Sequence, residues 1–264
     1  MQAHPRVEKS GHCRILVADK VDYKPSLGTI GIIEEGGRDV NVLVVRSTKV
    51  TADVFDSLQG LKLAGVKVAN CPGANADAVA ELTWGLILAC DRGIVEQTGE
   101  LKEGKWRKGK HSGRSRGLKG RKMGIIGFGR IGREVAARAR GFGMSLVVWN
   151  RSPLKHVEED VLVGCLFAKT CCKLQGKQMG NVIDEDALLS AMDKKNIRAG
   201  LDVFQHEPAL AEANFSSKLA AHPSVVCTHH IGAATTQAQA AVGQLVVEIV
   251  KEFDRTGEVL HAVK

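Results

Sequence analysis

The stretch that decides the fold is residues 122–152, KMGIIGFGRIGREVAARARGFGMSLVVWNRS. It begins with a short apolar run at 122–126, which is typical of a buried parallel strand. The turn GFGRIG follows at 127–132, then a helical pattern rich in Ala and Arg over 131–140, and then a second apolar run at 146–149. A strand, a GxGxxG turn, a helix and a second strand in this order predict a dinucleotide-binding fold.

Each glycine of the turn suits a separate task. Gly127 permits the tight turn, Gly129 lets the backbone approach a pyrophosphate, and Gly132 lets the helix pack close to the strand. The backbone N–H groups at the helix start and the side chain of Arg130 favour the anionic phosphates. We therefore expect these four residues to hold a pyrophosphate; the structural alternative is a glycine-rich turn that serves packing alone.

The residues after the second strand select the nucleotide. An acid at this place would bind the ribose 2′-hydroxyl and favour NAD, but the chain has Asn150, Arg151 and Ser152. Asn150 carries no charge that would repel a 2′-phosphate, and Arg151 attracts one. The sequence predicts NAD or NADP as cofactor, with tolerance of NADP(H) or a preference for it.

Strand and helix patterns alternate along the rest of the chain. Apolar runs predict further strands at 14–19, 42–45, 199–204 and 224–228, and helical patterns occur at 51–58, 78–90, 184–192 and 233–253. Pro and Gly predict a loop at 69–76. This alternation indicates an α/β architecture with a mostly parallel sheet.

Composition excludes several classes of protein. Of the 264 residues, 44% are apolar and 25% are charged, which argues against a disordered chain. The longest apolar run is too short to span a membrane, and the polar start lacks the apolar core of a secretory signal. Seven cysteines, an odd number, favour a reduced, cytoplasmic setting, and the spacing of Cys165, Cys171 and Cys172 is poor for zinc. We expect no metal and no membrane partner.

The positive charge is concentrated in one segment. Residues 102–122 contain ten Lys or Arg residues and one acid, Glu103, while the whole chain has a net charge of +8. Such a segment binds nucleic acid phosphates or forms a solvated loop. The loop is favoured because Trp106 is the one aromatic residue among the basic ones, so nucleic acid is not the expected partner.

Three motifs together identify a family. GFGRIG at 127–132, GLDVFQHEP at 200–208 and THHIGAATTQAQ at 228–239 resemble the D-isomer-specific 2-hydroxyacid dehydrogenases. Further similarity at 41–58, 71–89, 118–144 and 180–189 is closest to the phosphoglycerate dehydrogenases of that family. The resemblance implies a Rossmann-like parallel-sheet cofactor domain at 76–232. It also implies a smaller flavodoxin-like α/β substrate domain formed by 1–75 and 233–264, an active site in the cleft between the domains, and a homodimer.

The resemblance also implies the chemistry. The family transfers a hydride between a nicotinamide and C2 of a small anionic 2-hydroxy or 2-keto acid, here 3-phosphoglycerate of serine biosynthesis. His230 matches the catalytic histidine, and histidine suits proton transfer because it titrates near neutral pH. Glu207 matches the carboxylate that stabilises the protonated ring. Arg46 and Asn75 match substrate contacts, although Arg46 also suits a structural ion pair at a strand end.

Two neighbouring histidines compete for the catalytic position. His229 stands where relatives usually have proline, directly before His230. If the segment is extended, neighbouring side chains point to opposite faces, so only one ring faces the cleft. The match to the motif selects His230, and His206 is interpreted as a loop residue.

One departure from the family concerns the substrate clamp. The family has an arginine at the position of Met179, and a thioether neither donates a hydrogen bond nor neutralises an anion. The loss of such a buried charged partner costs about 2–5 kcal/mol. Lys173 and Lys177 are nearby point charges without the planar fork of arginine.

A second departure is length. Three segments look shorter than in relatives: after Asp19, between 63 and 68, and between 150 and 181. The absence of whole blocks of sequence fits a spliced or misassembled coding sequence, or a paralogue that has lost catalysis. In either case we expect both domains to be truncated. The alternative function is a catalytically impaired nucleotide-binding paralogue or corepressor-like module.

Overall fold

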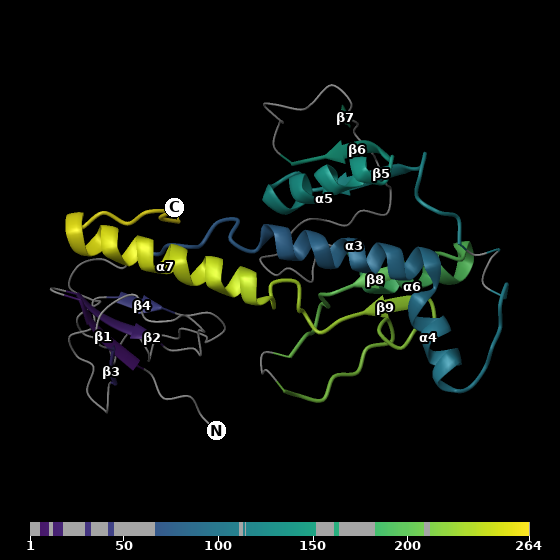
Figure 1. Cartoon of the computed structure of the whole chain (residues 1–264), viewed down its shortest axis with the longest axis horizontal. Helices are drawn as coiled ribbons and strands as arrows, with labels where there is room; N and C mark the ends of the chain where they lie inside the picture. The colour runs from purple at the N-terminus through teal and green to yellow at the C-terminus, as the bar shows by residue number, and fades with distance from the viewer. Residues whose placement is uncertain are drawn as a thin grey trace. The chain divides into compact units, whose positions relative to one another are not determined.

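The computed structural model describes residues 6–10, 13–17, 30–32, 42–44, 67–110, 113, 115–151, 161–163, 183–208 and 212–263. The chain divides into two compact units (Figure 1). The first unit is Met1–Asn75 with Ala234–Lys264, and the second is Ala76–Ala233. The helix predicted at 51–58 lies outside the described residues.

The first unit contains a four-stranded sheet with the order β3-β1-β2-β4. The strands are β1 (Arg6–Ser10), β2 (Cys13–Val17), β3 (Ile30–Ile32) and β4 (Val42–Val44). The two predicted strands, β2 and β4, pair in parallel. The unpredicted β1 pairs antiparallel with both β2 and β3, and only two residues separate it from β2. Such a short connection cannot make the crossover that a parallel pair requires.

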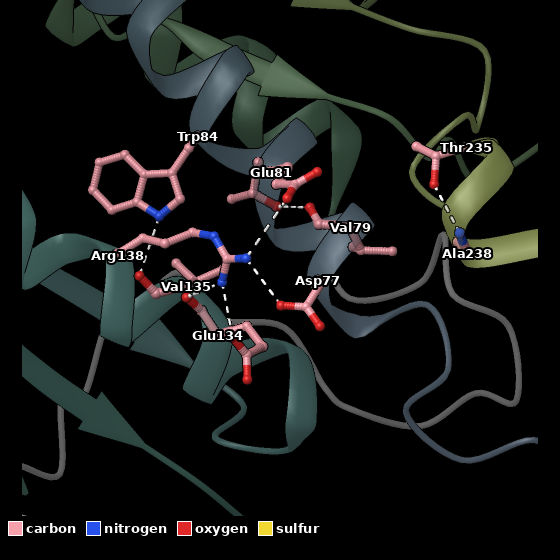
Figure 2. Close-up of polar contacts among 10 residues, drawn as sticks. Asp77, Val79, Glu81, Trp84, Glu134, Val135, Arg138, Thr235 and Ala238 are labelled. Carbon is pink, nitrogen blue, oxygen red and sulfur yellow. Dashed lines mark hydrogen bonds and ion pairs between the residues drawn. The ribbon is translucent and has the colours of Figure 1, made fainter. Parts of the chain in front are cut away.

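The long C-terminal helix of the first unit is α7 (Thr236–Thr256). The Thr235 hydroxyl accepts a hydrogen bond from the Ala238 N–H at 3.1 Å, which fixes the start of the helix three residues later than predicted (Figure 2). Gly257 ends the helix in the left-handed conformation, with φ of 73°. After the helix, an isolated antiparallel bridge joins Ala262 to Ala69.

The described strands of the second unit form two parallel sheets. The first sheet has the order β5-β6-β7, formed by β5 (Lys122–Ile126), β6 (Ser145–Trp149) and β7 (Val161–Val163). The second sheet pairs β8 (Ala199–Leu201) with β9 (Val225–Cys227). The predicted α/β architecture with parallel strands is therefore confirmed for this unit, and β5 has the predicted bounds.

Among its described residues, the second unit has the helices α3 (Ala76–Arg92), α4 (Ile94–Lys102), α5 (Arg130–Gly141) and α6 (Glu185–Lys195). Helix α3 packs against α5, β8 and β9 (Figure 1). Helix α6 starts as its sequence predicts, because the Asp184 carboxylate accepts a hydrogen bond from the Ala187 N–H at 2.9 Å. Helix α4 was not predicted, because its sequence has no apolar stripe of the kind that marks a helix. In agreement with this, each of its residues is exposed or half-buried.

The core of the second unit lies where α3, α5 and the first sheet meet. Ala80, Ala139 and Val148 have no exposed surface, and Trp84 is 5% exposed. The Trp84 indole N–H donates to the Val135 carbonyl at 3.1 Å. Its ring stacks on the Phe142 ring, and the two ring centroids are 4.4 Å apart. The small alanines let the two helices approach closely enough for this hydrogen bond.

Ion pairs add to the contact between α3 and α5. The Arg138 guanidinium lies 2.9 Å from Asp77, 2.8 Å from Glu134 and 3.8 Å from Glu81 (Figure 2). Hydrogen bonds to Asp77 and Glu134 raise the pKa of Arg138 above its ordinary value. Searched over the described ranges, the helices include none with the length and apolar content that a membrane crossing needs.

Candidate active site

The glycine turn follows the carboxyl end of β5. Gly127 has φ of 93°, a conformation that residues with a side chain rarely adopt. Its N–H donates to the Trp149 carbonyl at 2.8 Å, so the turn is attached to the end of β6. The geometry of the turn thus depends on a glycine at this position.

Gly132 and Gly129 lie in different surroundings. A Cβ added at Gly132 would stand 2.2 Å from the Gly127 carbonyl oxygen, so α5 and the turn approach too closely for any side chain there. A Cβ added at Gly129 would have no described atom within 4 Å. Packing within the protein accounts for Gly132, whereas the open space beside Gly129 is available to a ligand.

The start of α5 suits an anion. Gly129 is the N-cap residue, and among the described side chains none accepts a capping hydrogen bond there. The first turn contains no acid, and Arg130, its first residue, is exposed. The Arg133 guanidinium lies 4.8 Å from the centre of the Phe128 ring, which adds a second positive charge. The positive end of the helix dipole and both arginines fit the diphosphate of a dinucleotide.

The end of β6 lies against the same turn. The Asn150 side-chain oxygen accepts a hydrogen bond from the Phe128 N–H at 3.1 Å. This contact was not foreseen, and it gives Asn150 a structural task in holding the turn. Arg151 follows and is exposed, so it is the first charged side chain after the strand. Ser152 lies outside the described residues.

His230 and Glu207 come together after β9 and β8. His230 Nδ1 lies 2.9 Å from Glu207 Oε1. The two side chains are 44% and 35% exposed, so the pair is open to small molecules. Because β8 and β9 are parallel, their following loops leave the same edge of the sheet. The arrangement places a titratable ring against a carboxylate that orients it, as proton transfer requires.

The backbone at the two histidines differs from the expectation. His230 has φ of 54°, so the segment is not extended at this residue, and strand alternation does not separate the two rings. His229 is exposed, and the Glu207 contact belongs to His230. His206 lies in an exposed turn, in agreement with the prediction of a loop residue.

Neighbouring contacts hold the segment that carries Glu207. The Gln205 backbone N–H donates to Glu185 Oε1 at 2.8 Å, and its side-chain amide donates to the Ile183 carbonyl at 2.9 Å. Phe204 is buried and meets the ring of Phe215 edge-on at 5.3 Å. The two hydrogen bonds of Gln205 attach the segment before Glu207 to the start of α6.

Asp202 is a polar residue of this site that the sequence analysis missed. Its carboxylate accepts hydrogen bonds from the Thr228 hydroxyl at 2.6 Å, the Ile231 N–H at 2.8 Å and the Gly232 N–H at 2.9 Å. The predicted strand at 199–204 ran through Asp202, whereas β8 ends at Leu201. The available signal was an acid that interrupts an apolar run, at the carboxyl end of a strand.

Of the remaining candidate substrate contacts, the structure describes only Asn75. Asn75 is half-buried in the turn before α3. Arg46, Met179, Lys173 and Lys177 lie outside the described residues.

In the basic segment, Arg121 pairs with Asp91 at 2.9 Å, and Lys110 pairs with Glu100 at 2.6 Å. Part of the positive charge is therefore engaged within the protein.

Similarity to known proteins extends over most of the chain. The family described as D-isomer specific 2-hydroxyacid dehydrogenase, NAD binding domain, matches residues 84–168 and 179–232, more than half of the chain. A hydroxypyruvate reductase from Thermotoga maritima is 38% identical, over 81% of this chain and 85% of its own. A D-3-phosphoglycerate dehydrogenase from Methanocaldococcus jannaschii is 34% identical over 86% of this chain, which spans 52% of that relative.

Solved structures agree with the sequence comparison. An NADPH-dependent glyoxylate/hydroxypyruvate reductase from Sinorhizobium meliloti superposes with a TM-score of 0.70 and 26% identity, over 88% of this chain and 87% of the other. The Rossmann-type cofactor fold is thus shown, with NAD or NADP as the cofactor of such domains. The chain belongs to the D-isomer specific 2-hydroxyacid dehydrogenases, whose members transfer a hydride between NAD(P) and a 2-hydroxy or 2-keto acid.

Proposed function

We propose that this chain is an active NAD(P)-dependent 2-hydroxyacid dehydrogenase. The observation that carries the proposal is the hydrogen bond between His230 and Glu207 in the unit that also contains the glycine turn. A bound nicotinamide supplies the acceptor or donor of the hydride. In the oxidative direction His230 takes the proton of the substrate hydroxyl while the hydride leaves C2, and in the reductive direction it returns that proton.

The two units take different roles in this proposal. Residues 76–232 bind the cofactor, with Gly127, Gly129, Arg130 and Gly132 around the diphosphate and Asn150, Arg151 and Ser152 near the ribose. Residues 1–75 and 233–264 bind the substrate, with Arg46 and Asn75 as its polar contacts. The chain works as a cytoplasmic homodimer; the resemblance of its motifs supports this part.

The proposed substrate is 3-phosphoglycerate. The phosphoglycerate dehydrogenase from M. jannaschii supports this choice, and the hydroxypyruvate reductase from T. maritima supports a smaller substrate. Steady-state turnover of 3-phosphoglycerate, hydroxypyruvate and glyoxylate, each with both cofactors, decides between them. A kcat/KM that is highest for hydroxypyruvate or glyoxylate would remove 3-phosphoglycerate from the proposal and keep the dehydrogenase.

A variant at Arg46 provides a second test of the substrate. If Arg46 binds the phosphate of 3-phosphoglycerate, Arg46→Ala raises the KM for that substrate about 10-fold or more and leaves the KM for glyoxylate unchanged. If Arg46 instead forms a structural ion pair, both values change together or neither changes.

The second candidate function is nucleotide binding without turnover, and Met179 favours it because it replaces the arginine of the substrate clamp. A thermal shift with NADH and NADPH, followed by the turnover assay, separates the two functions, since a ligand raises the melting temperature whenever a folded site binds it. Binding without turnover supports the second function. A gain of turnover in Met179→Arg would show that the clamp alone is missing.

A further inference from the structure

We propose that residues 102–110, called the basic arm below, bind single-stranded nucleic acid. In this complex Trp106 stacks on an unpaired base, and the lysine and arginine side chains around it bind the phosphates. This binding is separate from the proposed dehydrogenase reaction, because it uses neither the glycine turn nor the pair of His230 and Glu207. The structure adds two features to the solvated loop expected here, an exposed aromatic ring and a fixed shape.

Trp106 is exposed to a degree that is unusual for tryptophan. It is 80% exposed, whereas Trp84 of the same chain is 5% exposed and lies in the core. Tryptophan is highly buried on average in folded proteins, so an exposed indole calls for a reason. Lys105 and Arg107 are its direct neighbours in the chain, and both are exposed. An aromatic ring between cations suits a base that stacks on the ring while its phosphates bind the charges.

The basic arm keeps an excess of positive charge after its own ion pairs are taken into account. It contains five Lys or Arg residues and one acid, Glu103. Lys105 pairs with Glu103 at 2.5 Å, and the lysine side chain is still 48% exposed, so a phosphate oxygen can reach it as well. Lys102 and Lys108 are exposed and have no ion pair among the described residues. These cations supply the electrostatic attraction on which non-specific nucleic acid binding depends.

The Glu100 carboxylate gives the basic arm a defined shape. Its Oε1 lies 3.3 Å from a guanidinium nitrogen of Arg107 and 2.6 Å from Lys110 Nζ, and the Glu100 side chain is only 18% exposed. The Lys105 N–H donates to the Glu100 carbonyl at 2.9 Å, and Gly104 turns the chain with φ of 73°. Because the arm is already held in one shape, a ligand meets a smaller entropic cost of ordering it.

Further cations lie near the start of α4. Arg121 pairs with Asp91 at 2.9 Å, and the Gly117 N–H donates to the same carboxylate at 3.1 Å, so this segment is attached to the end of α3. Lys119 and Lys122 are exposed and stand before or at the start of β5. The glycine turn follows the opposite end of that strand. A nucleic acid chain that runs along α4 therefore leaves the glycine turn free.

Charge distinguishes nucleic acid from the other partners that cover an exposed tryptophan. A symmetric pair of copies joined arm to arm brings two positively charged segments together, and like charges repel. A nucleic acid supplies flat base surfaces for Trp106 and negative charge for the lysines at the same time. Single strands suit the arm better than duplexes, because their bases are unpaired and free to stack on a side chain.

Fluorescence anisotropy with labelled oligouridylate and oligothymidylate, each about 12 nucleotides long, measures the binding. We expect a Kd of about 1–100 μM for the whole chain at physiological salt, and an increase of about 10-fold or more in Kd between about 50 and 200 mM salt. Equal affinity for the two oligonucleotides assigns the binding to bases and phosphates, and tighter binding of the RNA adds a contact to the 2′-hydroxyl; both results support the inference. A wild-type protein that binds neither oligonucleotide overturns it.

Variants at Trp106 test the stacking contact. Trp106→Ala should raise the Kd about 5- to 100-fold, whereas Trp106→Phe keeps a ring that stacks and should stay within about 3-fold of wild type. The melting temperature of both variants should remain near that of wild type, because the side chain is exposed. An unchanged Kd in Trp106→Ala would overturn the inference.

A lysine variant tests the phosphate contacts. Lys108→Ala should weaken binding at low salt and reduce the slope of log Kd against log salt concentration by about 0.7, the value for one phosphate of a single strand. Lys194→Ala removes an exposed lysine of α6 and is the matched control, which should leave both quantities unaltered. The same loss in the two lysine variants would point to net charge alone and contradict a site at the arm.

Two further measurements identify a different partner for the same surface. If analytical ultracentrifugation shows that Trp106→Ala converts a dimer into a monomer and wild type binds no oligonucleotide, the arm joins copies of this chain and the inference fails. If wild type binds phosphatidylserine vesicles and no oligonucleotide, the arm binds lipid and the inference fails as well. None of these measurements needs turnover, so their results do not depend on the proposed dehydrogenase reaction.

Discussion

Glu207 Oε1 lies 2.9 Å from His230 Nδ1, and the two residues follow adjacent parallel strands although 23 positions separate them in the chain. The contact occupies Nδ1 and leaves the other ring nitrogen, Nε2, available for the proton transfer proposed for His230. An ionised carboxylate only accepts hydrogen bonds, so the contact favours the tautomer that carries its proton on Nδ1.

The first prediction concerns this pair. Glu207→Gln keeps the shape of the side chain but cannot stabilise a charged imidazole, so kcat should fall about 10- to 1,000-fold. Steady-state kinetics measure kcat, and the Kd for NADPH serves as the control and should remain close to wild type. Full activity in Glu207→Gln would show that the pair is not part of the reaction.

The second prediction compares two glycines of the same turn. Gly132→Ala places a methyl group against the Gly127 carbonyl and should destabilise the protein by about 1–3 kcal/mol or more. Gly129→Ala meets no described atom and should leave the melting temperature nearly unchanged while it weakens NADH and NADPH binding about 10-fold. Thermal unfolding and fluorescence titration measure the two effects. Tight cofactor binding by Gly129→Ala would argue against the diphosphate site.

The third prediction concerns the choice of nucleotide. Arg151→Asp removes the charge that attracts a 2′-phosphate and supplies an acceptor for a ribose hydroxyl. The ratio of the Kd values for NADPH and NADH should shift about 10-fold or more in favour of NADH. Arg140→Asp, a change of the same charge in the last turn of α5, is the control and should leave the ratio unaltered. A wild-type protein that binds NADH much more tightly than NADPH would already contradict the prediction.

The fourth prediction ranks two contacts between α3 and α5. Trp84→Ala removes a buried ring and its hydrogen bond to Val135, which should lower the free energy of unfolding by about 3–5 kcal/mol. Arg138→Ala removes partly exposed ion pairs and should cost about 1 kcal/mol. Urea unfolding measures both values. An equal loss in the two variants would mean that the ion pairs carry more of the contact than their exposure indicates.

The fifth prediction concerns thiol reactivity. Burial raises the pKa of the Cys90 thiol, so less of it is thiolate at a given pH below that value. Cys227 is exposed. Iodoacetamide at pH 8 should therefore modify Cys227 about 10-fold faster or more, and the rate at Cys90 should continue to rise as the pH increases. Peptide mass mapping follows both sites, with Cys227→Ser as the control, and equal rates would disagree with the burial of Cys90.

Local patterns account for the elements that were predicted well. The bounds of β5 follow from an apolar run that ends at a glycine, and the start of α6 follows from an aspartate that caps it. Both signals lie within a few residues of the element that they define. By contrast, β1 and α4 were missed because their sequences lack a clear apolar period.

The residues of the candidate site also fall into two groups, those that short motifs predicted and those that only the structure revealed. Motifs short enough to read along the chain predicted Gly127, Glu207 and His230 as site residues, and the structure shows a positive φ at Gly127 and a contact between Glu207 and His230. The hydrogen bond from Phe128 to Asn150 joins residues that are 22 positions apart, and no sequence motif predicts a contact at this separation. The contacts of Asp202 with Ile231 and Gly232 span about 30 positions in the same manner.

By itself, the sequence determined the parallel α/β class, the dinucleotide-binding turn and the family, since all three depend on short motifs whose chemistry is local. Only the tertiary structure decided that His230 adopts a left-handed backbone and that Asp202 binds both sides of its loop. The physical reason is that a hydrogen bond depends on the distance between two atoms. For residues on different strands, the pairing of the strands sets that distance.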